Sequence, residues 1–372
     1  MQRCDQGRAK TLWSGDAGAV RRTVRYRLAS PRCAWPPDHR EAFQGRAREE
    51  IRPHVSPRDR LTSFLAVTGP TASGKTDLSL ALAEQFDIEI ISMDSRQVYQ
   101  GMDIGTDKVL AEDRQRVPHH GLDLVRPDER YSAGQFARDV RVWVGEISGR
   151  GRIPVIVGGT GFFLKAVMEP VFAEPTMDAA RVEGVRRYLK GQDPAVLAKW
   201  VQRLDPERAR LAIEGGPQRM SRTLEVALLT GVPLSRWHRE APAEAEAIGG
   251  TVVVLELPRE EMDRRIDDRV NRMVERGLLE EVRGLLNAGY GGDAPGMTGT
   301  GYREAMRHLQ GKATLEEAME DIRANTRRYA RRQITWFRNQ LPDSVLRIDA
   351  TAPIADQVRL TLAAWSAAME AP

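Results

Sequence analysis

Residues 69–76 form a glycine-rich loop, GPTASGKT, that fits the pattern G-x-x-x-x-G-K-[ST] at every position. Its glycines let backbone N–H groups converge on phosphate oxygens, and the loop feeds the N-terminus of a predicted helix, which favours anions. We expect the Lys75 ammonium to reach the terminal phosphate and the Thr76 hydroxyl to help hold Mg²⁺. The predicted polyphosphate site comprises Gly69, Pro70, Thr71, Ala72, Ser73, Gly74, Lys75 and Thr76. The loop alone does not distinguish ATP or GTP from an alkyl diphosphate.

Asp94 follows the second apolar segment of the chain, within ISMDSRQVYQGMDIGT. In doubly wound sheets, ligands lie beyond the carboxyl ends of the strands, so Asp94 should face a second substrate close to the phosphate loop. There the carboxylate could accept a proton from an attacking nucleophile, or it could hold Mg²⁺. A third interpretation is that Asp94 only caps the turn beside Ser95. The residues leave these three roles open.

Apolar segments alternate with helical ones around these two motifs. Strands are predicted at residues 63–69, 88–93, 153–159 and 251–257. Helices are predicted at residues 77–86 and 131–147, the second with Ser132 as its N-cap, and helical periodicity runs from residue 259 to 288. This alternation predicts an α/β fold of P-loop NTPase type, with a parallel sheet flanked by helices.

The domain organisation follows from where the strand-like segments stop. Residues 171–216 contain only helical stretches, at 181–190 and 194–204, and are predicted to form a small all-helical insertion. The α/β core would then comprise residues 61–170 and 217–350. We expect a last strand at 345–348 and a helix or tail at 351–372.

Length and composition exclude several classes of protein. The 372 residues suffice to bury a core without disulfide or metal staples, and two cysteines exclude a disulfide framework or a Cys-rich zinc site. No segment approaches the roughly 18 apolar residues of a membrane helix. We therefore expect a cytoplasmic monomer that contacts no membrane.

The net charge of +4 is unevenly distributed. Residues 1–60 carry 14 basic and 7 acidic residues, whereas the rest of the chain carries 42 and 45. The first sixty residues lack a secretory apolar core, and their acidic residues disfavour an organelle transit peptide. We interpret them as a basic, disordered extension, with a functional basic arm or a targeting segment as alternatives.

Several motifs together resemble the tRNA dimethylallyltransferase family. The resemblance runs over residues 62–340 in the family's order and is carried by GPTASGKT, DSRQVYQGMDIGT, PHHGLDLVRP, YSAGQF, VGGTGFFLKAV, PQRMSRTLEV, GYREA and TRRYARRQITWFR. It implies transfer of the five-carbon group of dimethylallyl diphosphate to N6 of adenosine 37 in the anticodon loop of tRNA. Diphosphate is released, and the adenine must leave its stack to be reached. The zinc finger of eukaryotic members is absent, which indicates a bacterial-type enzyme.

The resemblance also implies roles for individual residues. Asp94 matches the general base, Thr71 a threonine that contacts the reacting groups, and Arg269 a diphosphate-binding arginine; with Lys75 they form the expected catalytic set. The expected tRNA contacts are Asp94, Ser95, Arg96, Gln97, Thr160, Arg181, Gln218, Arg219, Met220, Ser221, Arg222, Thr298, Gly299, Thr300, Gly301, Tyr302 and Arg303. The sequence departs from the family's usual pattern at Phe163 and at residues 297–302, both on the tRNA side.

Each of these assignments has a purely structural alternative. Thr160 could cap the helix that follows Gly159, and Arg269 could be an exposed helical residue paired with Asp267 or Asp268. Arg219 and Arg222 could belong to a solvated helix face. His119 and His120 are more plausibly a structural pair than metal ligands, because neither a cysteine nor a third histidine lies nearby.

The segment 322–338 separates into two faces when it is plotted as a helix. Ile322, Tyr329, Ala330, Trp336 and Phe337 fall on one face, which should pack on the core. Six arginines and no acid fall on the other face: Arg323, Arg327, Arg328, Arg331, Arg332 and Arg338. Arginines four residues apart repel one another, so this face predicts contacts with tRNA phosphates, for which Arg327, Arg328 and Arg331 are the first candidates. The alternative is a solvated face.

A second function is compatible with the phosphate loop. A P-loop kinase acting on a small molecule would share the fold and would bind ATP at the same loop. The runs after Asp94 and around residue 330 favour prenyl transfer. A GTP-dependent switch is excluded, because the chain contains no N-K-x-D motif.

Overall fold

The structure is a computed structural model that describes residues 63–370 apart from 170, 173, 174, 176, 242 and 246. The predicted basic extension, residues 1–60, lies outside the described residues. A six-stranded sheet with the order β3-β2-β4-β1-β7-β8 forms the centre of the molecule, and all its neighbouring strands pair in parallel. Its strands are β1 (Ser63–Thr68), β2 (Ile88–Ser92), β3 (His119–His120), β4 (Ile153–Gly158), β7 (Gly249–Glu256) and β8 (Leu346–Asp349).

The α/β fold predicted from the sequence is confirmed, and five of these strands coincide with predicted segments to within two residues. The exception is β3, whose two histidines carry no strand-like apolar pattern. It is placed by its pairing with Ile90 and Ile91 of β2. Such short edge pairing is set by the neighbouring strand and not by local sequence.

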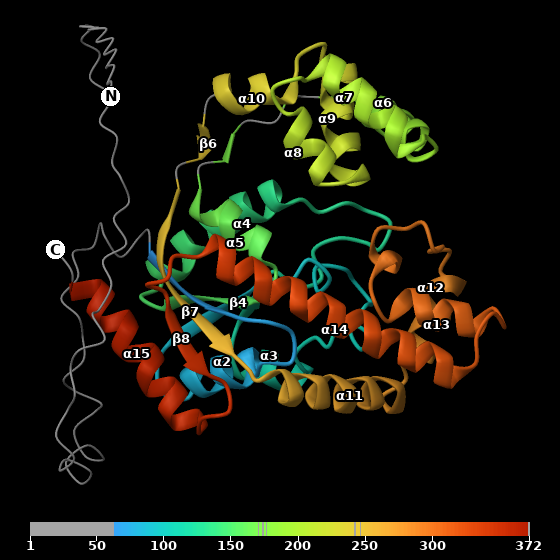
Figure 1. Cartoon of the computed structure of the whole chain (residues 1–372). Coiled ribbons are helices and arrows are strands. Elements are labelled where there is room, and N and C mark those ends of the chain that lie inside the picture. Colours follow the sequence, from blue (N-terminus) through green and yellow to red (C-terminus); the bar gives the residue numbers. More distant parts are fainter. Residues whose placement is uncertain are drawn as a thin grey trace, which may run out of the picture.

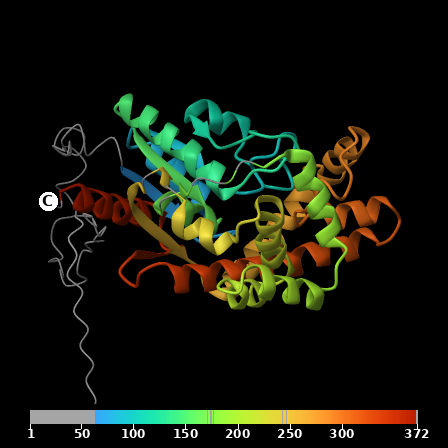
Figure 2. The same cartoon turned by 90° about the horizontal axis from the view of Figure 1, so that it is seen from above.

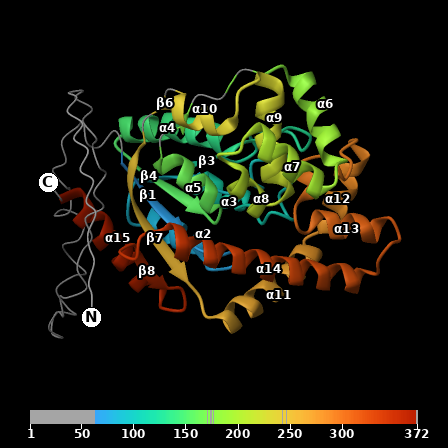
Figure 3. The ribbon, with the colours of Figure 1, turned by 45° about the horizontal axis from the view of Figure 1, so that its top comes forward.

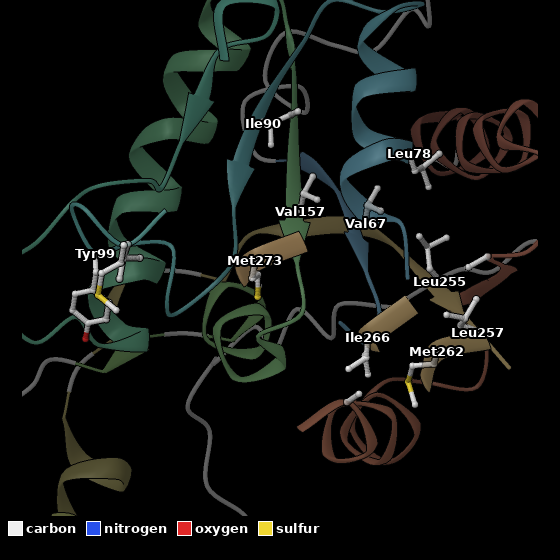
Figure 4. Packing of buried hydrophobic residues seen from close by; sticks show 14 of the residues in the cluster. Val67, Leu78, Ile90, Tyr99, Val157, Leu255, Leu257, Met262, Ile266 and Met273 are labelled. Atoms are coloured by element: carbon white, nitrogen blue, oxygen red, sulfur yellow. The ribbon is translucent and has the colours of Figure 1, made fainter. Parts of the chain in front are cut away.

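Both faces of the sheet are buried, because successive side chains of each strand point to opposite sides. Leu65 and Val67 of β1 join one core, and Phe64 and Ala66 join the other. The first core is closed by α2 (Lys75–Ala83), α11 (Arg259–Glu275), α12 (Leu278–Asn287) and α15 (Ile354–Glu370). Figure 4 shows its side chains converging from the strands and from α11. The second core is closed by α4 (Ala133–Gly149), α5 (Gly161–Met168) and the end of α14 (Leu315–Gln340).

Most predicted helices are confirmed, with some shifts at their ends. The helix after the phosphate loop is α2, and α4 begins after Ser132, whose hydroxyl accepts a hydrogen bond from the Gln135 N–H at 3.1 Å, as predicted for an N-cap. The periodicity over residues 259–288 is two helices, α11 and α12, separated at Gly277. The helix over 322–338 is the C-terminal part of the 26-residue α14.

The helical insertion is larger than predicted. Helices α6 (Ala179–Lys190), α7 (Pro194–Leu204), α8 (Ala209–Glu214) and α9 (Pro217–Thr230) share a core that includes Leu189, Leu197, Val201, Met220 and Leu224. Helix α10 (Leu234–Glu240) packs on α9, and the strands β5 (Val171–Phe172) and β6 (Ala243–Ala245) pair at the base. The predicted boundary at residue 216 was therefore wrong, because α9 has the same amphipathic pattern as a helix of the main core.

The insertion forms a lobe beside the sheet domain in Figure 1, and its lime and yellow helices stay grouped when seen from above in Figure 2. Figure 3 shows α14 extending from the region of α12 and α13 (Tyr302–Leu309) toward the sheet. None of the helices in residues 63–370 combines the length and the apolar content needed to cross a membrane.

Glu89 of β2 holds a cluster of charges at the start of the sheet. Its side chain is 3% exposed, and it contacts His120 at 2.7 Å, Arg150 at 2.8 Å and Arg152 at 3.0 Å. Burial raises the pKa of Glu89, but the hydrogen bonds from Arg150, His120 and Arg152 outweigh it and lower the pKa from 4.5 to about 2. The folded protein therefore favours the ionised carboxylate.

We predict that Glu89→Gln lowers the free energy of unfolding at neutral pH by about 2–3 kcal/mol. Because the folded pKa lies below the unfolded one, this contribution is complete above pH 4.5 and is lost as the pH falls toward 2. Urea unfolding as a function of pH measures it. Glu84→Gln removes an exposed pair with Arg116 and serves as a control expected to change stability little. An equal effect of both substitutions at neutral pH would contradict the prediction.

Candidate active site

A cleft of about 750 Å³ lies at the carboxyl edge of the sheet. It is lined by the phosphate loop, by the turns after β2 and β4, by arginines of α11, and by Tyr329 and Gln333 of α14. Thr71, Lys75, Thr76, Asp94 and Arg269 all line it. The cleft thus brings together the four predicted catalytic residues and the predicted metal ligand from three separate parts of the chain.

The phosphate loop has the local geometry that its sequence predicts. Gly74 adopts a left-handed conformation with φ 82° at the N-cap of α2, which favours glycine at this position. The Lys75 ammonium donates hydrogen bonds to the Pro70 carbonyl at 2.6 Å and to the Ser73 hydroxyl at 3.4 Å. These bonds hold the lysine over the loop, at the position where a phosphate would lie.

The electrostatics of Lys75 reflect a crowded cationic site. Burial and the nearby Arg269 lower the pKa of Lys75 from 10.5 to about 8, while Asp94 acts in the opposite direction. Desolvation and a like charge both disfavour the protonated amine. A bound polyphosphate would reverse this balance by supplying negative charge next to the ammonium.

Arg269 faces the phosphate loop from α11. Its guanidinium donates to the Thr71 hydroxyl at 2.8 Å and lies 3.4 Å from the carboxylate of Asp107. The alternative in which Arg269 pairs with Asp267 or Asp268 is wrong: these acids pair instead with arginines 327 and 264. Arg269 and Thr71 therefore form one unit beside Lys75.

Asp94 lies at the opposite wall of the cleft. Its Oδ1 accepts the Arg96 backbone N–H at 2.8 Å, so it does cap the turn, but this uses only part of the hydrogen-bonding capacity of a carboxylate. The Thr160 hydroxyl accepts the Ser95 N–H at 3.2 Å and makes no side-chain hydrogen bond to cap α5. Thr160 thus occupies the N-cap position of α5, as the structural alternative expects, but its hydroxyl does not cap the helix. Thr160 instead ties the turn after β4 to the turn that carries Asp94.

Two of the runs predicted to contact tRNA meet at the edge of the cleft. Arg96 donates to the Pro295 carbonyl at 2.9 Å and to the Thr298 hydroxyl at 3.3 Å. Thr298 and Arg303 are exposed, and roles in tRNA binding for them, for Thr300 and for residues 94–97 stay predictions.

Tyr302, in contrast, is 1% exposed and donates its hydroxyl hydrogen to Glu281 at 2.6 Å. Packing against Gly105 buries the ring, so the side chain presents no free surface for the tRNA contact predicted at this position. Gly299 and Gly301 are buried as well, so they also present no free surface.

The predicted tRNA contacts in the insertion have mixed outcomes. Met220 is 3% exposed within the core of the insertion, so its predicted contact was wrong. Arg222 is half-buried and forms an ion pair with the buried Glu225, so it does not lie on the solvated face considered as an alternative, and its contact with tRNA stays a prediction. The other predicted contacts stay predictions: Arg181, Gln218 and Arg219 are exposed, and Ser221 is partly exposed.

On the arginine face of α14, some side chains are partly buried in ion pairs and others are exposed to solvent. Arg323 and Arg327 are 20% and 22% exposed, and both form ion pairs with Asp267 of α11. Although no acid falls among these arginines in the sequence, acids from two helices neutralise part of the face: Asp267 of α11 and Glu320 of α14 each pair with both arginines. For Arg327 a contact with tRNA phosphates is therefore unfavourable. Arg328, Arg331 and Arg332 are exposed, and their predicted role is untested.

His119 and His120 have separate protein partners. The His119 Nδ1 lies 2.7 Å from the Val117 carbonyl, and burial lowers the pKa of this imidazole. His120 contacts Glu89 instead. Within residues 63–370, no group of three or more acidic, histidine or cysteine side chains could hold a metal ion by itself.

Three residues of the site were missed at the sequence level. Glu281 accepts the consecutive backbone N–H groups of residues 103–105 at 2.8, 2.7 and 3.0 Å, and thereby shapes the loop that carries Asp107. Tyr329 and Gln333 line the cleft from α14. A glutamine within the apolar face of a predicted helix was a usable signal for Gln333, whereas no pattern marks Glu281.

Two family models match the chain. The model described as IPP transferase matches residues 97–340, and the one described as isopentenyl transferase matches residues 62–119. A tRNA dimethylallyltransferase 2 of Geotalea uraniireducens is 41% identical over 278 residues, which are 74% of this chain and 88% of that protein. A tRNA dimethylallyltransferase of Geobacillus thermodenitrificans is 40% identical over 75% of this chain and 88% of its own length.

Solved structures agree with these matches. The full-length tRNA isopentenylpyrophosphate transferase of Bacillus halodurans has a TM-score of 0.59 and 32% identity, covering 83% of this chain and 98% of that one. A eukaryotic dimethylallyltransferase acting on tRNA has a TM-score of 0.67 and 28% identity, covering 80% and 78%.

The lowered pKa of Lys75 gives a prediction for anion binding. In the free protein Lys75 is half-protonated near pH 8, whereas beside a bound diphosphate it should be fully protonated. Binding of inorganic pyrophosphate at pH 8 should therefore take up about half a proton, and the affinity should fall as the pH rises further. Calorimetry in buffers of different ionisation enthalpy measures this uptake. Lys75→Arg keeps the charge but does not titrate in this range, so its proton uptake should be smaller by about half a proton, because only the change in pyrophosphate ionisation remains. Equal uptake in both proteins would contradict the assignment.

Proposed function

Because the chain belongs to the IPP transferase family, we propose that it transfers the dimethylallyl group of dimethylallyl diphosphate to N6 of adenosine 37 in tRNA, with release of diphosphate. The observation that supports this most is the single cleft in which a cationic phosphate loop faces Asp94. One half of the cleft suits a diphosphate leaving group, and the other half suits a proton-bearing nucleophile.

The leaving group is stabilised by the phosphate-loop side of the cleft. As the C–O bond breaks, negative charge grows on the diphosphate, and preorganised donors lower the energy of that charge. Lys75, Arg269 and the backbone N–H groups at the start of α2 supply them. Mg²⁺, when bound, would neutralise further diphosphate charge; the hydroxyl oxygen of Thr76 in the cleft is a donor of the kind it prefers.

The acceptor side carries the proton transfer. An exocyclic adenine amine is a weak nucleophile, so removal of its proton as the C–N bond forms assists the attack. Asp94 accepts this proton. A nucleobase that is stacked within the anticodon loop cannot reach the cleft. The adenine of adenosine 37 must therefore flip out of its stack and into the cleft.

The proposed substrate also bears on the location and the partners of the protein. We propose that it acts as a cytoplasmic monomer on tRNA, with no membrane partner. The exposed arginines of α14 and the exposed residues of the insertion, including Arg181 and Arg219, are the candidate tRNA contacts.

A transfer assay tests the proposal directly. Purified protein is incubated with radiolabelled dimethylallyl diphosphate and unmodified tRNA, and in parallel with radiolabelled ATP and a set of small acceptors. We expect label in tRNA in the first reaction and no phosphorylated acceptor in the second. The reverse outcome would support the small-molecule kinase that the phosphate loop also allows.

We predict that Asp94→Ala lowers kcat for prenyl transfer by about 10²–10⁴-fold, because the N6 proton loses its acceptor. The affinity for tRNA, measured by filter binding, should fall much less. Near-wild-type turnover would remove Asp94 from the mechanism. A loss that excess Mg²⁺ restores would assign the carboxylate to the metal instead.

We predict that the combined replacement of Arg328, Arg331 and Arg332 by Gln weakens tRNA binding and flattens its salt dependence by about 2–3 units of slope. The KM for dimethylallyl diphosphate should change little. A matched control replaces three exposed arginines of other helices, Arg116, Arg259 and Arg359. An unchanged slope in the first variant would mean that the face is only solvated.

A further inference from the structure

Gln333 is a buried amide on the face of α14 that packs against the core. Its side chain lines the cleft, and the residue is only 7% exposed, between the fully buried Ala330 and the nearly buried Phe337. A buried carboxamide without hydrogen-bond partners would lower the stability of the fold at such an apolar position. Gln333 therefore needs specific partners, and the structure provides two.

Both ends of the carboxamide are bonded to backbone groups of different loops. The Gln333 Nε2 donates to the Gly159 carbonyl at 2.8 Å, and its Oε1 accepts the Thr71 N–H at 2.8 Å. The fit is close: a Cβ atom on Gly159 would lie 2.3 Å from the Gln333 Nε2. One side chain thus bridges the phosphate loop and the turn after β4.

Each of the two bridged loops contacts residues that belong to one side of the proposed reaction, either the leaving group or the acceptor. On the leaving-group side, Thr71 accepts a hydrogen bond from Arg269 through its hydroxyl. On the acceptor side, Thr160 follows Gly159 and holds the Ser95 N–H, next to Asp94. The carboxamide of Gln333 therefore connects the two walls of the cleft that carry the reacting groups.

The hydrogen bond between Gln333 and Thr71 also limits how the phosphate loop can use the Thr71 N–H. The Thr71 N–H points to Gln333 and so is not free to bind a phosphate oxygen, and Gln333 itself contacts no residue of the loop other than Thr71 in the hydrogen bonds described. Gln333 therefore acts on the phosphate loop through Thr71, whose N–H bonds to Gln333 and whose hydroxyl accepts a bond from Arg269.

We propose that Gln333 is a positioning residue for prenyl transfer, whose carboxamide sets the spacing between the diphosphate-binding wall and the wall that carries Asp94. The inference rests on the proposed function. A misplacement of about 1 Å between reacting groups is enough to lower a rate by about 10²-fold, so the loss of either bond should reduce kcat.

The pH dependence of kcat in a Gln333→Glu variant tests this positioning role. A protonated glutamic acid has one donor and one acceptor, like the amide, whereas the ionised form loses the donor and repels the Gly159 carbonyl. We expect kcat of this variant to be about 10²-fold below wild type near pH 8, and the gap to narrow to about 10–20-fold near pH 5.5 as the protonated fraction of the acid rises. A merely structural role would change stability but would leave the ratio of the two kcat values independent of pH.

Two further variants complete the experiment. Gln333→Met has a similar length without either hydrogen bond; its kcat should be low at every pH, while its Kd for inorganic pyrophosphate should stay within about threefold of wild type. Gln340→Glu, an exposed change on the same helix, should follow the wild type. If Gln333→Glu does not fold, the split between kcat and pyrophosphate binding in Gln333→Met decides.

The outcomes separate the two claims. Parallel pH profiles of Gln333→Glu and wild type, or a wild-type kcat in Gln333→Met, would overturn the role of Gln333 while prenyl transfer stands. An equal loss of kcat and of pyrophosphate affinity in Gln333→Met would also overturn it, because it would mean that the phosphate site itself had collapsed. A wild-type protein that transfers no prenyl group to tRNA would instead reject the proposed function.

Discussion

Several positive charges must be held together at one edge of the sheet, and much of the structure serves this requirement. Burial of Lys75, and then repulsion between its ammonium and Arg269, lower the pKa of Lys75. Carboxylates placed around them reduce the repulsion: Asp107 lies near both Arg269 and Arg276, and Asp94 lies across the cleft. A bound diphosphate would relieve the remaining repulsion, so affinity for such an anion follows from the charge arrangement itself.

Helix α14 converts this arrangement into a site with two distinct walls. Arg327 fastens it to α11, which carries Arg269, while Phe337 packs it into the second core of the sheet. Between these anchors, Gln333 bonds to the phosphate loop and to the turn after β4. A single rigid helix therefore determines where the donor wall lies relative to the acceptor wall, which is the geometry that a transfer reaction depends on.

The sequence was sufficient wherever the physical cause is local. The phosphate loop, the strands beside it and the Ser132 cap depend on short-range patterns, and all of these predictions are confirmed. The errors occur where distant segments meet. Arg327 pairs with Asp267 of α11 in addition to Glu320 of its own helix, the burial of Tyr302 depends on Gly105, and α9 belongs to the insertion because of helices that precede it. No periodicity within one segment contains that information.

Nucleosides from cellular tRNA test the central claim most directly. In a strain that lacks this protein, the account predicts that mass spectrometry finds no N6-dimethylallyl adenosine at position 37, and that the wild-type gene, but not one encoding Asp94→Ala, restores it. An unchanged amount of this nucleoside in the deletion strain would contradict the account.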